Sequence, residues 1–136
     1  MKQIFAIIII LLTGLVADGQ KDSILGKQFQ LTGRIKAEVQ RPPDCGIFAW
    51  GTVVEFEVIK LSGMKYAKKT IGIIITCPEL YENISFVKGQ TYQIVFSDKN
   101  QDPFEWLVPN INLLKNYDLS FEPYAVSVKT VIDAIQ

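Results

Sequence analysis

Apolar and polar side chains alternate without a break over residues 28–40. The odd-numbered positions, from Phe29 to Val39, are apolar or glycine, and the even-numbered positions are polar or charged. A two-residue period is that of a β-strand with one buried face, so this stretch predicts a strand. Gly33 lies on the apolar face, where it predicts a bend or bulge. The segment 41–44, with its two prolines, predicts the end of the strand.

Three further stretches have the pattern of strands. Residues 48–61 alternate in their middle part, and residues 91–96 alternate again after a lysine-glycine turn. Residues 70–77 are almost wholly apolar and β-branched, which is typical of a central strand buried on both faces. Residues 78–85 begin with Pro78 followed by acidic side chains, and this order predicts one or two helical turns.

The last third of the chain has a weaker pattern. Residues 102–117 mix aromatic, proline and asparagine residues, so we expect an irregular segment with a helical turn near Leu113 and Leu114. Residues 124–135 suit either a final strand or a short helix, because Val126 supports the first and the later apolar spacing supports the second.

The order of these elements predicts an all-β fold. Long strands, a bend glycine and a short helix between the third and fourth strands match a five-stranded OB-like Greek-key barrel. Closing the sheet into a barrel would hide its edges and fill the interior with the apolar faces of the strands.

The first nineteen residues predict a cleaved signal peptide. Lys2 precedes the apolar run 4–12, and the small residues of 17–19 stand where a signal peptidase cuts. The alternative is a membrane anchor, which needs about 20 apolar residues and is disfavoured by the shorter run. We therefore expect residues 20–136 to form a single domain that is secreted or periplasmic and free of the membrane once the leader is removed.

Cys45 and Cys77 are the two cysteines of the chain. An even number of cysteines in an exported protein favours a disulfide, and the alternative is two buried free thiols. Their separation excludes a redox motif with two residues between the cysteines and a compact zinc knuckle.

Charge and composition exclude several classes of function. The formal net charge is zero, whereas nucleic-acid-binding domains normally carry a basic excess. The chain has no histidine, which removes Ser-His-Asp and Cys-His catalysis and the usual zinc ligand. Glu55 and Glu57 lie on one strand face, but we interpret them as a solvated outer face rather than a catalytic pair. We predict a protein that is not an enzyme and uses no cofactor or metal.

Residues 86–94 read Phe-Val-Lys-Gly-Gln-Thr-Tyr-Gln-Ile. This stretch resembles the Phe-x-x-Gly-x-x-Tyr-x-Val segment of netrin-like domains, which are exported OB barrels and include the tissue inhibitors of metalloproteinases. The resemblance implies a protease-inhibitor-type protein that acts through protein contacts. In those inhibitors a mature N-terminal cysteine chelates the zinc of the target, and Gln20 stands at that place here. Zinc chelation therefore does not carry over.

Four aromatic residues are candidates for a binding surface. Phe48 and Trp50 lie where the second strand begins, and Phe104 and Trp106 lie in a polar, proline-bounded region. Aromatic side chains favour interfaces, and loops on a rigid scaffold often carry function. For the first pair the alternative is core packing beside the disulfide, and for the second pair it is a flap that plugs the barrel. The sequence thus favours an exported binding module whose ligand, a protein partner or a small molecule, it does not identify.

Overall fold

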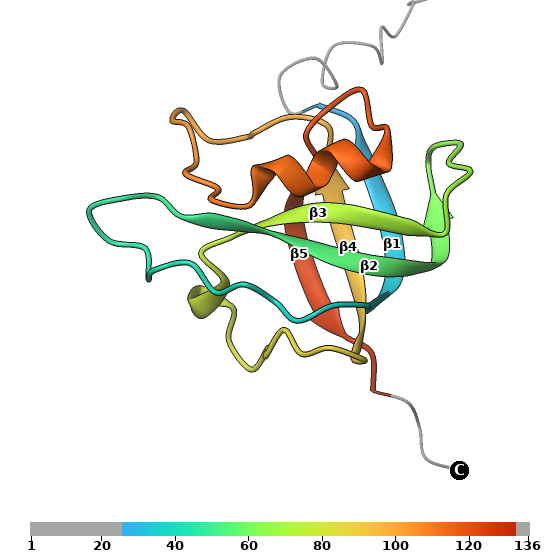
Figure 1. The fold of residues 1–136 in the computed structure, drawn as a ribbon, viewed down its shortest axis with the longest axis horizontal. Helices are drawn as coiled ribbons and strands as arrows, with labels where there is room; N and C mark the ends of the chain where they lie inside the picture. Colours follow the sequence, from blue (N-terminus) through green and yellow to red (C-terminus); the bar gives the residue numbers. More distant parts are fainter. Residues whose placement is uncertain (1–25, 133–136) are drawn as a thin grey trace, which may run out of the picture.

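Five strands form a closed barrel in the computed structural model of the chain, which describes residues 26–132 (Figure 1). The strands are β1 (Gln28–Ile35), β2 (Gly51–Ser62), β3 (Thr70–Thr76), β4 (Thr91–Ser97) and β5 (Tyr124–Thr130). Their order around the barrel is β1-β2-β3-β5-β4. All neighbouring strands are antiparallel except β3 and β5, which meet in parallel where the Ile74 N–H donates to the Pro123 carbonyl oxygen at 2.8 Å. The prediction of an all-β barrel is confirmed.

β1 pairs with β2 on one side and with β4 on the other. Its register with β2 shifts between Thr32 and Gly33, which confirms the predicted bulge. A Cβ atom at Gly33 would lie 3.0 Å from the Cβ of Phe56 and 3.2 Å from the Glu57 carbonyl oxygen. Glycine is therefore needed here because β1 and β2 approach closely where the barrel bends.

β1 is shorter than predicted, since the strand ends at Ile35 although the alternation continues to residue 40. Beyond this point the edge of β2 is occupied by other groups. The Gly51 N–H donates to the Leu107 carbonyl oxygen at 2.9 Å, and the side chain of Asn110 pairs with both backbone groups of Val53. Residues 37–44 therefore have no free strand edge to pair with. The alternation of side chains along the sequence does not show which segment will occupy that edge.

The barrel interior is filled by apolar and aromatic side chains. Each of them contributes about 1.5–3 kcal/mol on burial. The buried members of this core are Phe29, Leu31, Ile35, Val54, Phe56, Ile71, Ile73, Ile75, Phe86, Tyr92, Ile94, Phe96 and Val128. Tyr92 is the one with a polar group, and its hydroxyl donates to the Ser85 carbonyl oxygen and accepts the Val87 N–H at 3.1 Å. Its burial therefore leaves no unpaired phenol.

β3 is buried on both faces, as its sequence predicts. One face belongs to the core, and the 3-10 helix η2 (Ile111–Tyr117) covers the other (Figure 1). A Cβ atom at Gly72 would lie 2.9 Å from the Tyr117 ring. The absence of a side chain at residue 72 therefore lets η2 approach β3 closely. The predicted helical turn near Leu113 and Leu114 is thereby confirmed, and residues 124–130 adopt the strand alternative.

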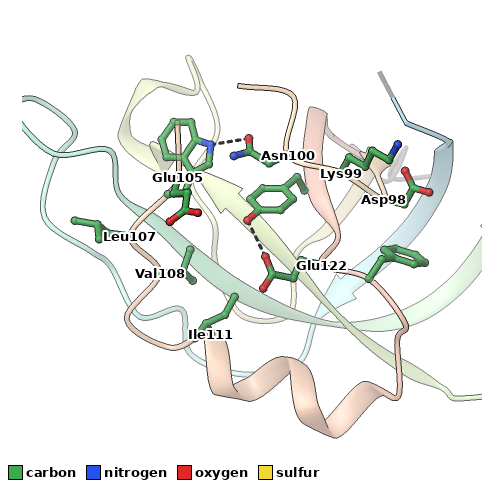
Figure 2. A pocket seen from close by; sticks show the side chains of 11 residues that line it. Asp98, Lys99, Asn100, Glu105, Leu107, Val108, Ile111 and Glu122 are labelled. Carbon is green, nitrogen blue, oxygen red and sulfur yellow. Dashed lines mark hydrogen bonds between the residues drawn. The ribbon is translucent and has the colours of Figure 1, made fainter. Parts of the chain in front are cut away.

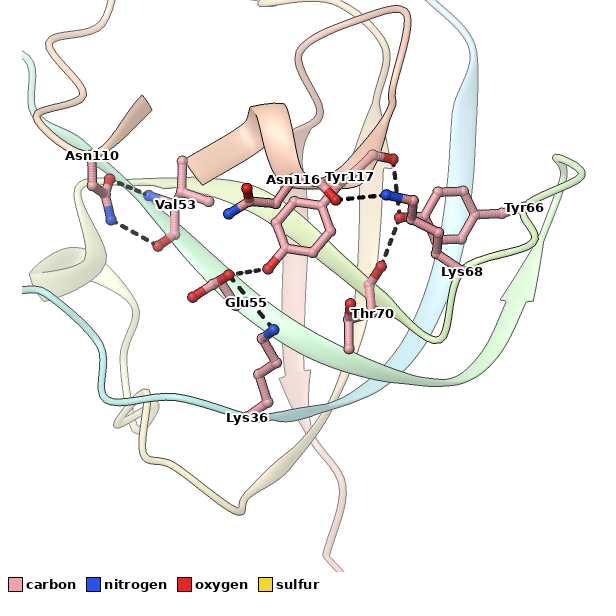
Figure 3. A network of polar contacts seen from close by, with 9 residues as sticks. All are labelled: Lys36, Val53, Glu55, Tyr66, Lys68, Thr70, Asn110, Asn116 and Tyr117. Carbon is pink, nitrogen blue, oxygen red and sulfur yellow. Dashed lines mark hydrogen bonds and ion pairs between the residues drawn. The ribbon is translucent and has the colours of Figure 1, made fainter. Parts of the chain in front are cut away.

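Polar contacts fix η2 to the barrel (Figure 3). The Tyr117 hydroxyl donates to the Glu55 carboxylate, and the Lys36 ammonium lies 3.8 Å from the same carboxylate and 5.7 Å from the centre of the Tyr117 ring. Glu57 is exposed as predicted, with Arg34 at 3.8 Å. The interpretation of Glu55 as a solvated side chain is wrong, because η2 comes from far along the chain to cover it.

The tyrosines on this face and at β5 make the fold sensitive to alkaline pH. Burial, with the hydrogen bond to Glu55 and its charge, raises the pKa of Tyr117, and burial with the hydrogen bond to Glu122 raises the pKa of Tyr124 to about 12. The folded chain therefore keeps phenol protons that the unfolded chain, with tyrosine pKa values of about 10, has already lost. The stabilisation is complete below about pH 10 and is lost as the pH rises towards 12.

We expect the free energy of unfolding to fall steeply above about pH 10, as measured by urea unfolding at a series of pH values. Tyr117→Phe should be less stable than the wild type at neutral pH and should show a shallower decline, because one titrating phenol has been removed. An identical pH dependence in the variant and the wild type would contradict the assignment.

Between β3 and β4 the chain forms a single 3-10 turn, η1 (Pro78–Leu80). Among residues 26–132, no helix has the length and apolar character that crossing a membrane requires. The predicted signal peptide, residues 1–19, lies outside the described residues.

Candidate functional site

The disulfide predicted between Cys45 and Cys77 is present and ties the β1–β2 loop to the end of β3. The Cα atoms of the two cysteines are 5.6 Å apart. The Trp50 N–H donates to the Cys45 sulfur at 3.3 Å, and the Cys77 N–H donates to the Trp50 carbonyl oxygen at 2.9 Å. The N–H and the carbonyl oxygen of Trp50 are thus both held by hydrogen bonds to the two bridged cysteines.

The β1–β2 loop and the β4–β5 loop run side by side near this disulfide. The Leu107 N–H donates to the Ala49 carbonyl oxygen at 2.8 Å, and Trp50 and Leu107 form a parallel β-bridge. Two segments far apart in the sequence, residues 47–50 and 104–107, are therefore neighbours. We call them the aromatic loop pair.

Asn110 anchors the second of these loops to β2 (Figure 3). Its side-chain oxygen accepts the Val53 N–H at 2.8 Å, and its amide nitrogen donates to the Val53 carbonyl oxygen at 3.0 Å and to the Thr52 hydroxyl at 3.2 Å. One amide side chain thus replaces a strand neighbour along this edge.

The aromatic loop pair contains all four aromatic residues that the sequence singled out. Phe48 and Phe104 are 58% and 47% exposed, and Trp50 and Trp106 are half-buried. The ring centres of Phe48 and Trp50 are 6.2 Å apart, and those of Phe104 and Trp106 are 5.0 Å apart. None of the four belongs to the barrel core.

Two aliphatic side chains extend this surface. Ile47 is 97% exposed and Leu107 is 45% exposed. Together with Phe48 and Phe104 they place four exposed apolar side chains on two adjoining segments. Single exposed apolar residues are normal on a protein surface, whereas several on adjoining segments favour a contact surface.

A pocket of about 610 Å³ opens beside the aromatic loop pair (Figure 2). Its walls come from the β4–β5 loop and from the residues that lead into β5. They are Asp98, Lys99, Asn100, Glu105, Trp106, Leu107, Val108, Ile111, Phe121, Glu122 and Tyr124. Glu105, Trp106 and Leu107 belong both to this pocket and to the loop pair, so the pocket adjoins the segment 104–107.

Hydrogen bonds fix the aromatic walls of the pocket. The Trp106 indole N–H donates to the Asn100 side-chain oxygen at 3.2 Å and to the Asp102 carboxylate at 3.1 Å. The Tyr124 hydroxyl donates to the Glu122 carboxylate at 2.9 Å (Figure 2). Burial and this hydrogen bond, with the charges of Glu122 and Glu105, raise the pKa of Tyr124 to about 12. Both carboxylates thus act on the same phenol.

Sequence reasoning identified one part of this site and missed the other. Glu105 stands between Phe104 and Trp106 and could have been found with them. Glu122 and Tyr124 follow η2, and no local pattern connects them with the aromatic segment.

The cysteine and carboxylate side chains that lie close together in residues 26–132 do not indicate a metal site. Among residues 26–132, one set of three potential ligands has its atoms within 4.8 Å of one another, namely Cys45, Cys77 and Glu79. Both sulfur atoms are joined in the disulfide, so they cannot act as thiolate ligands.

Comparison of the chain with protein-family models, with curated proteins and with solved structures finds no match in any of the three. Function is therefore inferred from the geometry of the aromatic loop pair and its pocket.

Proposed function

We propose that the mature chain is an exported, non-enzymatic binding module that docks on a partner through the aromatic loop pair. The observation that carries this proposal is the parallel bridge between Trp50 and Leu107, which places the exposed rings of Phe48 and Phe104 on adjoining segments. Aromatic side chains dominate the binding energy of interfaces, because each one removes a large area from water with few rotatable bonds to order.

The rigidity of the loops supports the same proposal. The disulfide holds the first segment, and Asn110 holds the second. A surface whose backbone is already fixed loses less conformational entropy when it binds, so more of the contact energy contributes to affinity.

We also propose that the barrel is OB-like in its details. The strand order, with β5 between β3 and β4, supports this fold. OB-folds use the loops between strands 1 and 2 and between strands 4 and 5 for binding, and the aromatic loop pair comes from these two loops. The position of the site and the proposed fold are therefore consistent with each other.

The netrin-like resemblance lies in residues that pack the barrel. Phe86 and Tyr92 stack in the core with ring centres 5.7 Å apart, and Gly89 has a positive φ of 86° in the turn between them. These positions support the barrel proposal, whereas none of them lies in the aromatic loop pair. An inhibitor of proteases acting through protein contacts remains the alternative function.

Export is supported by the disulfide, because such bonds persist in oxidising compartments. Together with the sequence of the leader, this supports binding in the periplasm or outside the cell.

The test is partner capture from the exported protein fraction of the source cells, followed by titration of the captured partner. We expect Phe48→Ala and Phe104→Ala each to weaken binding about tenfold, since each removes roughly 1.4 kcal/mol of contact energy. Ile59→Ala is the matched control, because Ile59 is 54% exposed on β2 and lies outside the loop pair. A partner that binds all three variants equally would show that the contact surface lies elsewhere.

A further inference from the structure

The pocket beside the aromatic loop pair combines two kinds of wall. The rings of Trp106, Phe121 and Tyr124 form part of it, and the carboxylates of Glu105 and Glu122 form another part (Figure 2). Its volume of about 610 Å³ is in the range of pockets that hold a ligand group.

The charges of the pocket favour a cation. Three acidic residues line it, namely Asp98, Glu105 and Glu122, against the one basic residue Lys99. No ion pair within residues 26–132 involves Glu105 or Glu122. A cation in the cavity would be attracted by both carboxylates.

The aromatic rings favour an organic cation over a small metal ion. Ammonium and guanidinium groups are attracted to the faces of tryptophan and tyrosine rings. The Trp106 indole is already oriented by Asn100 and Asp102, and the Tyr124 phenol is oriented by Glu122. The planar guanidinium of arginine can stack on a ring and also donate to two carboxylates, which makes arginine the better fit.

The surroundings of the pocket indicate where such a cation comes from. Leu107 lines the pocket and also belongs to the exposed apolar surface with Phe48 and Phe104. A free amine would leave this surface uncovered, whereas a peptide segment would place a basic side chain in the pocket and apolar neighbours on the rings. A nucleic acid would be repelled by the carboxylates.

We propose, building on the proposed function, that the pocket receives an arginine or lysine side chain of a partner protein whose flanking apolar residues lie on the aromatic loop pair. The partner is thus a basic, apolar segment, and the carboxylates select it by charge while the rings supply contact area.

The experiment uses three probes with the full mature protein. The first is the capped peptide acetyl-Phe-Leu-Arg-Leu-Phe-amide, and the second is the same peptide with citrulline, which keeps the shape of arginine without its charge. The third is argininamide, a free cation without the apolar flanks. Binding is followed by tryptophan fluorescence and by amide chemical shifts. We expect the arginine peptide to bind at least tenfold more tightly than either of the other probes.

Variants of the carboxylates test the pocket itself. Glu105→Gln and Glu105→Gln/Glu122→Gln should weaken binding of the arginine peptide about tenfold or more and reduce its salt dependence, with little change for the citrulline peptide. Glu105 is exposed, so its single variant should keep the wild-type unfolding temperature. Glu57→Gln is the control, because Glu57 is an exposed carboxylate on β2 that does not line the pocket.

Three outcomes would overturn the inference. These are equal affinity for the arginine and citrulline peptides, no binding of either, or tighter binding of argininamide alone. If Phe104→Ala weakens the binding of both peptides and the glutamine variants weaken the binding of neither, the aromatic loop pair is still the contact surface. In that case only the assignment of the pocket to a basic side chain is wrong. Failure of the proposed function itself appears separately, in the partner titration with Phe48→Ala and Phe104→Ala.

Discussion

Replacing Cys45 and Cys77 together with alanine should lower the free energy of unfolding by roughly 3–4 kcal/mol. The bond closes a loop with a sequence separation of 32 residues, and the chain-entropy model gives this magnitude for a loop of that size. The loss should be largest at the aromatic loop pair, because the disulfide holds the backbone of Trp50 through two hydrogen bonds. Urea unfolding of the variant and the wild type measures the effect.

Chemical reduction provides the control for this prediction. Adding a thiol reductant should destabilise the wild type by a similar amount and leave the double alanine variant unchanged. A loss of less than about 1 kcal/mol in the variant would show that the loop is held by its other contacts, and the entropic account would then be wrong.

Asn110→Ala should destabilise the fold by about 2–4 kcal/mol, although asparagine is not a core residue. Its side chain satisfies the N–H and the carbonyl of Val53, and Val53 is only 3% exposed. A buried polar group that loses its partner costs about 1–3 kcal/mol, and two such groups are affected here. The same substitution should weaken partner binding, because it releases the loop that carries Phe104.

Asn112→Ala is the matched control for Asn110→Ala. Asn112 lies in η2 and is exposed, so its loss should change the unfolding free energy by less than about 0.5 kcal/mol. Equal effects of the two variants in urea unfolding would mean that Asn110 is not an anchor of the loop.

Four of the five strands were predictable because their signal is local. The side chains of a strand alternate between its faces, so the period of residues 28–40 and the β-branched run of residues 70–77 indicate strands wherever the chain places them. The bulge at Gly33 was predictable for the same reason, since a glycine on an apolar strand face adds no side chain to the core and usually marks a bend or a close approach of two strands.

The limits of these strands were less predictable, because they depend on which segment covers an edge. The alternation continues past Ile35, but Leu107 and Asn110 occupy the β2 edge that a longer β1 would need. The interpretation of Glu55 failed in a similar way, since Tyr117 reaches it from a position 62 residues further along the chain.

The candidate site likewise combines features that are visible in the local sequence with features that depend on contacts between distant segments. Phe48, Trp50, Phe104 and Trp106 were identifiable as aromatic residues in loop-like surroundings, and Glu105 was visible beside them. Their placement on adjoining segments depends on the bridge between Trp50 and Leu107, and the pocket depends on the chain's return through Glu122 and Tyr124.

By itself, the sequence determined the presence of four of the five strands, the apolar faces that form the core and the two cysteines available for a bond. These properties follow from the chemistry of neighbouring side chains, which is fixed before folding. Only the tertiary structure decided which loops lie side by side, which glutamate is covered and which carboxylates share a pocket with aromatic rings. Such features arise from contacts between distant segments, and the closure of the barrel brings those segments together.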